Sequence, residues 1–239
     1  MGTFDPGLGT LIDYHVHLSE DLNLEEAVAL AEHRHMRFGI AEHPGAAYNI
    51  ETDGDLTSYV RRLKAHAVYV GLQPMHLNWA ADFSAEAIDQ LDYVLMDADT
   101  LPMDDGTFLH IWRHDNFIWD VDAFIARYWA HIVNILSDEP IDIFARPTYL
   151  PVSLARHYDE IWTESRMRTI IELAKERDIA LEIAEQVRVP GLRFVQMAKE
   201  AGAKFTFGTN ARDQHAGDFH YCLEIAQRAA LTREDMFTL

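Results

Sequence analysis

The sequence predicts an α/β barrel built from parallel strands. Three observations support this prediction. Seven short apolar runs are spread along the chain, segments with helical periodicity lie between most of them, and no evident linker divides the 239 residues. Short apolar strands that alternate with amphipathic helices are typical of βαβ units and a parallel sheet. Seven such units favour one barrel domain over residues 1–239 rather than two smaller domains.

The predicted strands are short apolar runs bounded by polar residues. Runs of this kind are typical of strands that are buried on both faces, as in parallel sheets. In order, they are residues 11–15, 38–41, 67–72, 93–96, 141–145, 180–183 and 205–208.

The predicted helices carry apolar residues three and four positions apart, which places those residues on one face. In the first of them, Leu24, Val28 and Ala31 share a face. The predicted helices are residues 24–35, 56–66, 121–136, 161–175, 192–201 and 219–229. The longest irregular stretch, residues 97–120, holds Trp112, Trp119, His110 and His114, and we expect either a functional loop or a packed surface excursion there.

Composition excludes several classes of protein. Hydrophobic residues make up 49% of the chain, which supplies a sizeable core and excludes disorder. The 20 Lys and Arg residues are outnumbered by 39 Asp and Glu residues, giving a formal net charge of −19. This charge repels phosphate backbones, so we expect no nucleic-acid partner. A small anionic substrate is compatible with it if cations gather in a pocket.

The chain carries a single cysteine, Cys222, so an intrachain disulfide and a cysteine-rich zinc site are excluded. We find no signal peptide and no run long enough to span a membrane, and therefore expect a cytoplasmic protein without a membrane partner. The sequence leaves the oligomeric state open.

Polar residues follow each of the seven predicted strands. In parallel barrels the active site lies at the carboxyl ends of the strands. The residues at these ends are Asp13, His15 and His17; Glu42 and His43; Gln73 and His76; Asp97 and Asp99; Arg146 and Thr148; Glu182 and Glu185; and Thr209, Asn210, Arg212 and Asp213.

The first strand ends in a His-x-His pattern. Residues two apart point to the same side of a strand, so we expect Asp13, His15 and His17 to share one face. Two imidazoles placed in this way can reach one divalent cation. His33 and His35 lie instead on a predicted helix and point apart, so we expect both in solvent or at an interface. We interpret His66, His131 and His157 in the same way, whereas His215 and His220 follow the last strand and are further site candidates.

The chain resembles the polymerase and histidinol phosphatase (PHP) family from Ile12 to about Leu231, and in particular its histidinol-phosphatase branch. The resemblance implies a distorted (β/α)7 TIM-like barrel and a trinuclear metal site that hydrolyses phosphate esters. It is carried by DYHVH at 13–17, EHP at 42–44, VGLQ at 70–73, DYVLMDAD at 92–99, IDIFARP at 141–147, LEIA at 181–184 and GTNAR at 208–212.

Several positions depart from the family pattern. His15, His17 and His43 are kept. Gln73 stands where the family has a bridging glutamate, Asp99 and Arg146 where it has histidines, and Asn210 and Arg212 where it has an aspartate and a histidine. Gln73 and Asn210 each remove a negative charge, and a guanidinium cannot ligate a metal. We therefore expect no trinuclear site and weak or absent histidinol-phosphatase activity.

Two hypotheses follow. The first is a divergent PHP-type hydrolase that acts on a small anionic, phosphorylated substrate. One divalent ion (zinc, manganese or iron) would be held by His15 and His17 with Asp99 and His43. The catalytic residues would be Arg146, Arg212, Asn210 and Gln73, with the two arginines clamping a phosphate or carboxylate. The alternative is a metal-free, catalytically inert PHP-like protein in which the arginines hold the anion. An amidohydrolase-like enzyme is a third and weaker candidate, because the chain has no evident bridging lysine.

Overall fold

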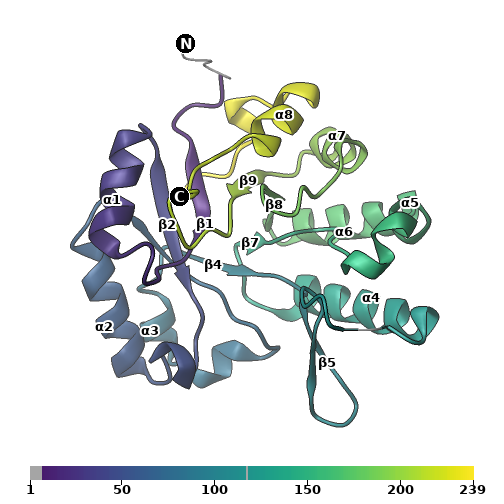
Figure 1. The fold of residues 1–239 in the computed structure, drawn as a ribbon, viewed down its shortest axis with the longest axis horizontal. Helices are drawn as coiled ribbons and strands as arrows, with labels where there is room; N and C mark the ends of the chain where they lie inside the picture. The colour runs from purple at the N-terminus through teal and green to yellow at the C-terminus, as the bar shows by residue number, and fades with distance from the viewer. Residues whose placement is uncertain (1–6, 117) are drawn as a thin grey trace.

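The computed structural model describes residues 7–116 and 118–239, and within these ranges seven parallel strands close into a barrel (Figure 1). The barrel strands pair in chain order, and the last of them pairs with the first. The fold class and the positions of the seven strands predicted from the sequence are confirmed. The strands are β1 (Ile12–Val16), β2 (Arg37–Glu42), β3 (Tyr69–Leu72), β4 (Tyr93–Met96), β7 (Ile143–Phe144), β8 (Ala180–Ala184) and β9 (Phe205–Gly208).

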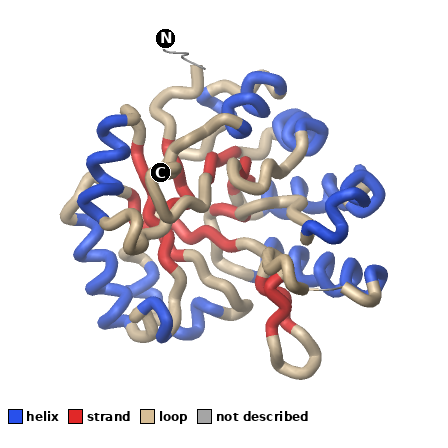
Figure 2. The backbone as a smooth tube through the Cα atoms, in the orientation of Figure 1, coloured by secondary structure: helices blue, strands red, loops and turns tan. Residues whose placement is uncertain are grey.

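The helices lie around the outside of the barrel (Figure 2). They are α1 (Leu24–His33), α2 (Asp53–Lys64), α3 (Ala85–Ile88), α4 (Val121–Asp138), α5 (Tyr158–Ile161), α6 (Glu164–Glu176), α7 (Leu192–Ala201) and α8 (Tyr221–Arg228). Short 3-10 helices span Ala46–Tyr48, Trp79–Asp82, Val152–His157 and Arg233–Asp235. No helix in the described ranges is long and apolar enough to cross a bilayer.

Capping side chains account for two differences from the predicted helix bounds. Helix α2 begins three residues earlier than predicted, because Thr52 and Asp55 form a reciprocal capping box at its start. The helix predicted over 161–175 is divided, because Trp162 leaves helical geometry and Thr163 caps the new helix α6.

The stretch of residues 97–120 contains structure that the sequence analysis missed. Strands β5 (Thr100–Pro102) and β6 (Phe108–His110) pair antiparallel and form a hairpin that projects from the barrel (Figure 1).

The predictions for the helical histidines are confirmed in part. His33 and His35 are exposed as expected, but the prediction for His131 is wrong, because α4 buries this side chain.

The barrel interior is filled by an apolar cluster that is separate from the layer between barrel and helices. Tyr93 lies at its centre and donates a hydrogen bond of 2.6 Å to the carbonyl oxygen of Tyr14. Gly39 and Gly71 make room for its ring, since a Cβ atom there would lie 2.4 Å and 2.3 Å from Tyr93. This apolar cluster fills the barrel interior, and the polar residues lie toward the carboxyl ends of the strands.

Candidate functional site

The polar residues of the first strand have different partners. The pairing of β1 with β2 shifts register between Asp13 and Val16. The rings of His15 and His17 lie together, with centroids 5.2 Å apart. Asp13 instead accepts hydrogen bonds from Thr209 and from the backbone of Gly217. Asp13 therefore fastens β1 to the segment after β9, while the rings of His15 and His17 lie together.

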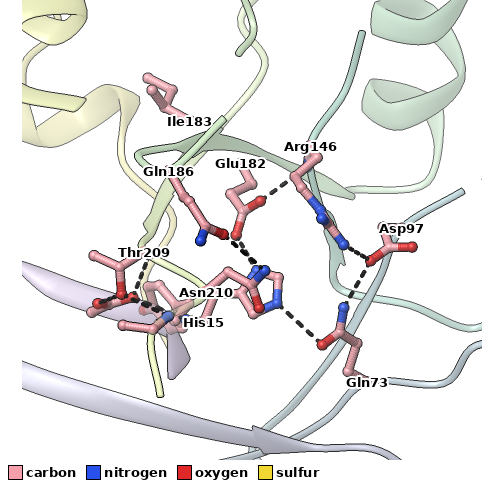
Figure 3. Close-up of polar contacts among 12 residues, drawn as sticks. His15, Gln73, Asp97, Arg146, Glu182, Ile183, Gln186, Thr209 and Asn210 are labelled. Atoms are coloured by element: carbon pink, nitrogen blue, oxygen red, sulfur yellow. Dashed lines mark hydrogen bonds and ion pairs between the residues drawn. The ribbon is translucent and has the colours of Figure 1, made fainter. Parts of the chain in front are cut away.

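Five residues from five strand ends form a closed circuit of hydrogen bonds, which we call the polar ring: Glu182, His15, Gln73, Asp97 and Arg146 (Figure 3). His15 donates from Nδ1 to Glu182 at 2.7 Å and from Nε2 to the side-chain oxygen of Gln73 at 3.1 Å. Gln73 donates from Nε2 to Asp97 at 2.8 Å. Arg146 closes the circuit, donating from Nη2 to Asp97 and from its backbone N–H to Glu182 at 2.9 Å.

The ring fixes the orientation of Gln73 and with it the protons on His15. The amide nitrogen of Gln73 must face Asp97, because a carboxylate only accepts hydrogen bonds. The amide oxygen consequently faces Nε2 of His15, which must carry a hydrogen. Since Nδ1 faces the Glu182 carboxylate, both ring nitrogens of His15 are engaged in hydrogen bonds within the polar ring. A glutamate at position 73 would offer Asp97 no donor.

Arg146 is paired with two buried carboxylates at the end of β4. Its Nη2 contacts Asp97 and its Nη1 lies 3.0 Å from Oδ2 of Asp99. Burial pushes the pKa of Asp97 upward, but the Arg146 guanidinium outweighs burial and the net pKa is lowered. Burial raises the pKa of Asp99 well above its usual range despite the same guanidinium. Asp97 and Asp99 thus share one cation, Arg146, and the titration of each depends on the other.

His17 and His43 form a second group beside the ring. Their rings stack with centroids 5.0 Å apart, and His43 in turn lies 4.9 Å from the ring of Tyr48. His43 donates from Nδ1 to the backbone oxygen of Gln73 at 2.9 Å, so its Nε2 is an acceptor. Both ring nitrogens of His17 are buried without a hydrogen-bonding partner. Burial lowers the pKa of His43 to about 4 and that of His17 well below its usual range, so both are neutral at pH 7.

A cavity of about 780 Å³ lies above these groups. The predicted site residues that line it are His43, Gln73, Arg146, Asn210 and Arg212. The other three, His15, His17 and Asp99, are buried beneath it with at most 1% of their surface exposed. Arg146 and Arg212 therefore share a cavity, as predicted. His215 and His220 line a neighbouring pocket with Arg212.

Arg212 differs from Arg146 in its partners. Its Nη1 donates to the side-chain oxygen of Asn210 at 3.3 Å, and Asn210 donates to Gln186 at 3.4 Å. Burial, with a smaller contribution from Arg146, lowers the pKa of Arg212, and Glu42 partly offsets this. Arg212 forms a hydrogen bond with Asn210 but no ion pair within the described residues, so its positive charge can still be matched by a ligand.

Two of the site residues are among the non-glycine residues that have a left-handed backbone. Arg146 has φ of 50° and Asn210 has φ of 53°, both in the left-handed region. Asparagine tolerates this region, whereas arginine adopts it at a cost of the order of 1 kcal/mol. The fold therefore holds Arg146 in place against its backbone preference, as is common at functional sites.

The metal site implied by the family resemblance does not fit these residues. Both ring nitrogens of His15 are engaged in hydrogen bonds, so neither offers a metal a free lone pair, and Asp99 is paired with Arg146. His17 and His43 remain, fewer than the three protein ligands of typical zinc sites. Among the described residues, no group of three or more His, Cys, Asp or Glu side chains is arranged to hold a metal ion.

Two members of the polar ring, Asp97 and Glu182, were not among the predicted functional residues. Both stand at strand ends in the sequence, which is the signal that could have identified them. Position 208 is adapted to Glu182, because a Cβ atom on Gly208 would lie 1.9 Å from its Oε1 and 2.8 Å from Cβ of His15.

We expect Gly208→Ala to destabilise the protein by about 1–3 kcal/mol, because the new methyl group displaces Glu182 from the ring. Urea unfolding followed by circular dichroism measures the change. Gly54→Ala is the matched control: its Cβ atom would lie 3.6 Å from Thr52, an ordinary contact, inside helix α2. If both variants are equally stable, the side chain of Glu182 can move aside for the methyl group at little cost, which would contradict the prediction.

Similarity to known proteins was found among solved structures and in neither of the two other comparisons. No protein-family model matches the chain, and no curated protein matches its sequence. A chain of archaeal ribonuclease P with mature tRNA is 13% identical with a TM-score of 0.49, covering 93% of this chain and 83% of that one. Deoxyribose phosphate aldolase from Aeropyrum pernix is 10% identical with a TM-score of 0.46, covering 98% and 88%. Pyruvate carboxylase from Rhizobium etli is 12% identical with a TM-score of 0.49, and only 22% of that chain is covered.

These three TM-scores are below 0.5. The barrel fold is therefore established by the strand pairing, and the activities of the matched proteins are not transferred to this chain.

Proposed function

We propose that this protein is a divergent PHP-like barrel that binds a small anionic molecule in the cavity without a metal ion. The observation that carries the proposal is the polar ring. It engages His15, Gln73 and Arg146 in hydrogen bonds within the ring, where the family resemblance implies metal ligands. The proposal therefore favours the metal-free alternative over the metal-dependent hydrolase.

The charges that line the cavity support an anionic ligand. Arg146 and Arg212 contribute two positive charges against one carboxylate, Asp97, and His43 is neutral because burial lowers its pKa to about 4. The excess positive charge is set in a protein whose formal net charge is −19. Because both terminal nitrogens of Arg146 already contact carboxylates, we assign the contact with the anionic group to Arg212.

The size and walls of the cavity indicate a small organic ligand. A volume of about 780 Å³ lies in the range of small-molecule sites. Tyr48, Trp112 and Tyr149 supply aromatic walls, and Asn210 and Gln186 supply amide groups. Such a lining suits a molecule with a phosphate or carboxylate at one end and an apolar or ring-bearing body.

A one-metal hydrolase is the second candidate function. It is favoured by the unpartnered ring nitrogens of His17, which lie beside His43. It lacks a third ligand in the described residues, so we derive no catalytic step from it. Elemental analysis after purification without chelator separates the candidates: about one equivalent of zinc, manganese or iron per chain, together with hydrolysis of p-nitrophenyl phosphate, would replace the first proposal by the second.

The first proposal predicts that the cavity binds phenyl phosphate and that Arg212→Ala weakens this binding by about 10–100-fold, because a charge-assisted hydrogen bond contributes about 1.5–3 kcal/mol. Isothermal titration calorimetry at low salt measures both affinities.

Arg193→Ala is the matched control, because Arg193 is exposed and pairs with Glu164 away from the cavity. It should leave the affinity unchanged. No binding of phenyl phosphate or inorganic phosphate to the unmodified protein, or equal loss in both variants, would contradict the assignment of Arg212.

A further inference from the structure

We infer that the guanidinium of Arg146 is a built-in counter-ion that fills a cation site, and that this site accepts a small planar organic cation once the side chain is removed. The inference deepens the proposed function, on which it rests, by naming what replaces a metal beneath the cavity. The site is formed by the carboxylates of Asp97 and Asp99 and the ring of Tyr149.

The contacts of Arg146 have the geometry of a guanidinium receptor. Two terminal nitrogens of one planar group reach two carboxylates, with Nη1 3.0 Å from Asp99. The guanidinium carbon lies 5.7 Å from the ring centroid of Tyr149, within the range of cation–π attraction. Carboxylates presented on one side and an aromatic face on another select a flat, delocalised cation over a compact one.

Burial makes the site dependent on a cation. Asp97 is 8% exposed and Asp99 is 1% exposed, so neither carboxylate can be stabilised by bulk water. Removing one partner of a buried ion pair leaves an uncompensated charge, which costs far more than the pair itself contributes. Without Arg146, Asp97 must therefore find another cation or take up a proton.

The site is also accessible. Arg146 and Asp97 both line the cavity, so a side chain deleted at position 146 leaves a space that a solute can enter through it. Glycine is the appropriate replacement, because the left-handed φ of 50° at this position costs glycine nothing. Arg146→Gly removes the guanidinium while retaining the backbone N–H that donates to Glu182.

The chain offers a closely matched control in Arg188. This residue also has a left-handed backbone, with φ of 54°, pairs with a carboxylate, Glu224 at 3.6 Å, and lies 5.2 Å from the ring of Tyr221. It differs from Arg146 in exposure, since 68% of its side chain is in solvent. Arg188→Gly thus makes the same substitution where water solvates the remaining carboxylate.

The test is chemical rescue of thermal stability. We expect Arg146→Gly to melt below the unmodified protein, and millimolar guanidinium or methylguanidinium to raise its melting temperature by about 3–6 °C at ten times the dissociation constant. The unmodified protein and Arg188→Gly should show no increase. Adding Asp97→Asn to Arg146→Gly should abolish the rescue, because it removes the charge that binds the cation.

If Arg146→Gly does not fold alone, its refolding yield with and without methylguanidinium provides the same readout. Absence of rescue in both assays, equal rescue of Arg188→Gly, or rescue by manganese or zinc but not by guanidinium would overturn the inference. Phenyl phosphate binding by the unmodified protein is measured separately, so failure of the rescue is distinguishable from failure of the proposed function.

Discussion

The fourfold variant Arg146→His, Arg212→His, Gln73→Glu and Asn210→Asp is expected to bind a divalent metal ion that the unmodified protein does not retain. The changes remove two positive charges and add two negative ones, a swing of about four charges with histidine counted as neutral at pH 7. In a partly desolvated site, a change of this size outweighs a modest mismatch in ligand geometry. The structure adds a specific reason, because Arg146→His frees Asp97 and Asp99 from their guanidinium.

Gln73→Glu should act together with Arg146→His. A glutamate at position 73 would place a second carboxylate against Asp97, where Gln73 now donates a hydrogen bond of 2.8 Å. Such a pair of carboxylates requires a proton or a cation between them. Elemental analysis for zinc and manganese after dialysis gives the result, with Arg212→His alone as the control, since that variant leaves Arg146 in place. A folded fourfold variant without additional metal would refute the idea that these residues replace the charge of a metal cluster.

Tyr93→Ala is expected to destabilise the protein by about 3–5 kcal/mol, the range for removing a large buried aromatic side chain. Tyr93 is 1% exposed, and Gly39 and Gly71 leave the space that its ring fills. Glycines carry no side chain that can move into the void, so the barrel interior collapses poorly. The hydrogen bond to the carbonyl oxygen of Tyr14 is lost as well.

Thermal unfolding should show a decrease of roughly 2–4 °C for each kcal/mol in a chain of this size. Tyr93→Phe separates the two contributions, because it keeps the ring and removes the hydroxyl, and we expect it to cost about 0.5–1.5 kcal/mol. If the two variants have equal stability, the ring does not fill the barrel as described.

The barrel could be predicted from the sequence because its signal is local. Each strand is a short apolar run, and strands β4 and β9 begin and end where the runs do. The hairpin of β5 and β6 could not be predicted in this way, since three-residue strands are too short to show an alternating pattern. His131 was misplaced although the apolar periodicity of α4 could have placed it, because it lies three residues after the buried Tyr128.

The sequence predicted which residues gather at the candidate site better than it predicted the hydrogen bonds and ion pairs among them. Closure of the barrel gathers the carboxyl ends of all its strands around one cavity, which placed His15, Gln73 and Arg146 near one another. The hydrogen bonds of Asp13 to Thr209 and Gly217, which keep this residue out of the polar ring, have no signature in the residue types. The pairing of Arg146 with Asp97 and Asp99 depends on side-chain reach across the barrel, which spacing along the chain does not encode.

The position of Trp112 makes ligand entry observable by intrinsic fluorescence. Trp112 lines the cavity and is 39% exposed, whereas Trp79 and Trp162 are fully buried in the core. Indole emission shifts to shorter wavelength when water leaves its surroundings, and a bound molecule would displace water from Trp112. The other four tryptophans, including the exposed Trp119, do not line the cavity and would contribute a constant background. Unlabelled small anions can therefore be screened against this protein by following the emission maximum alone.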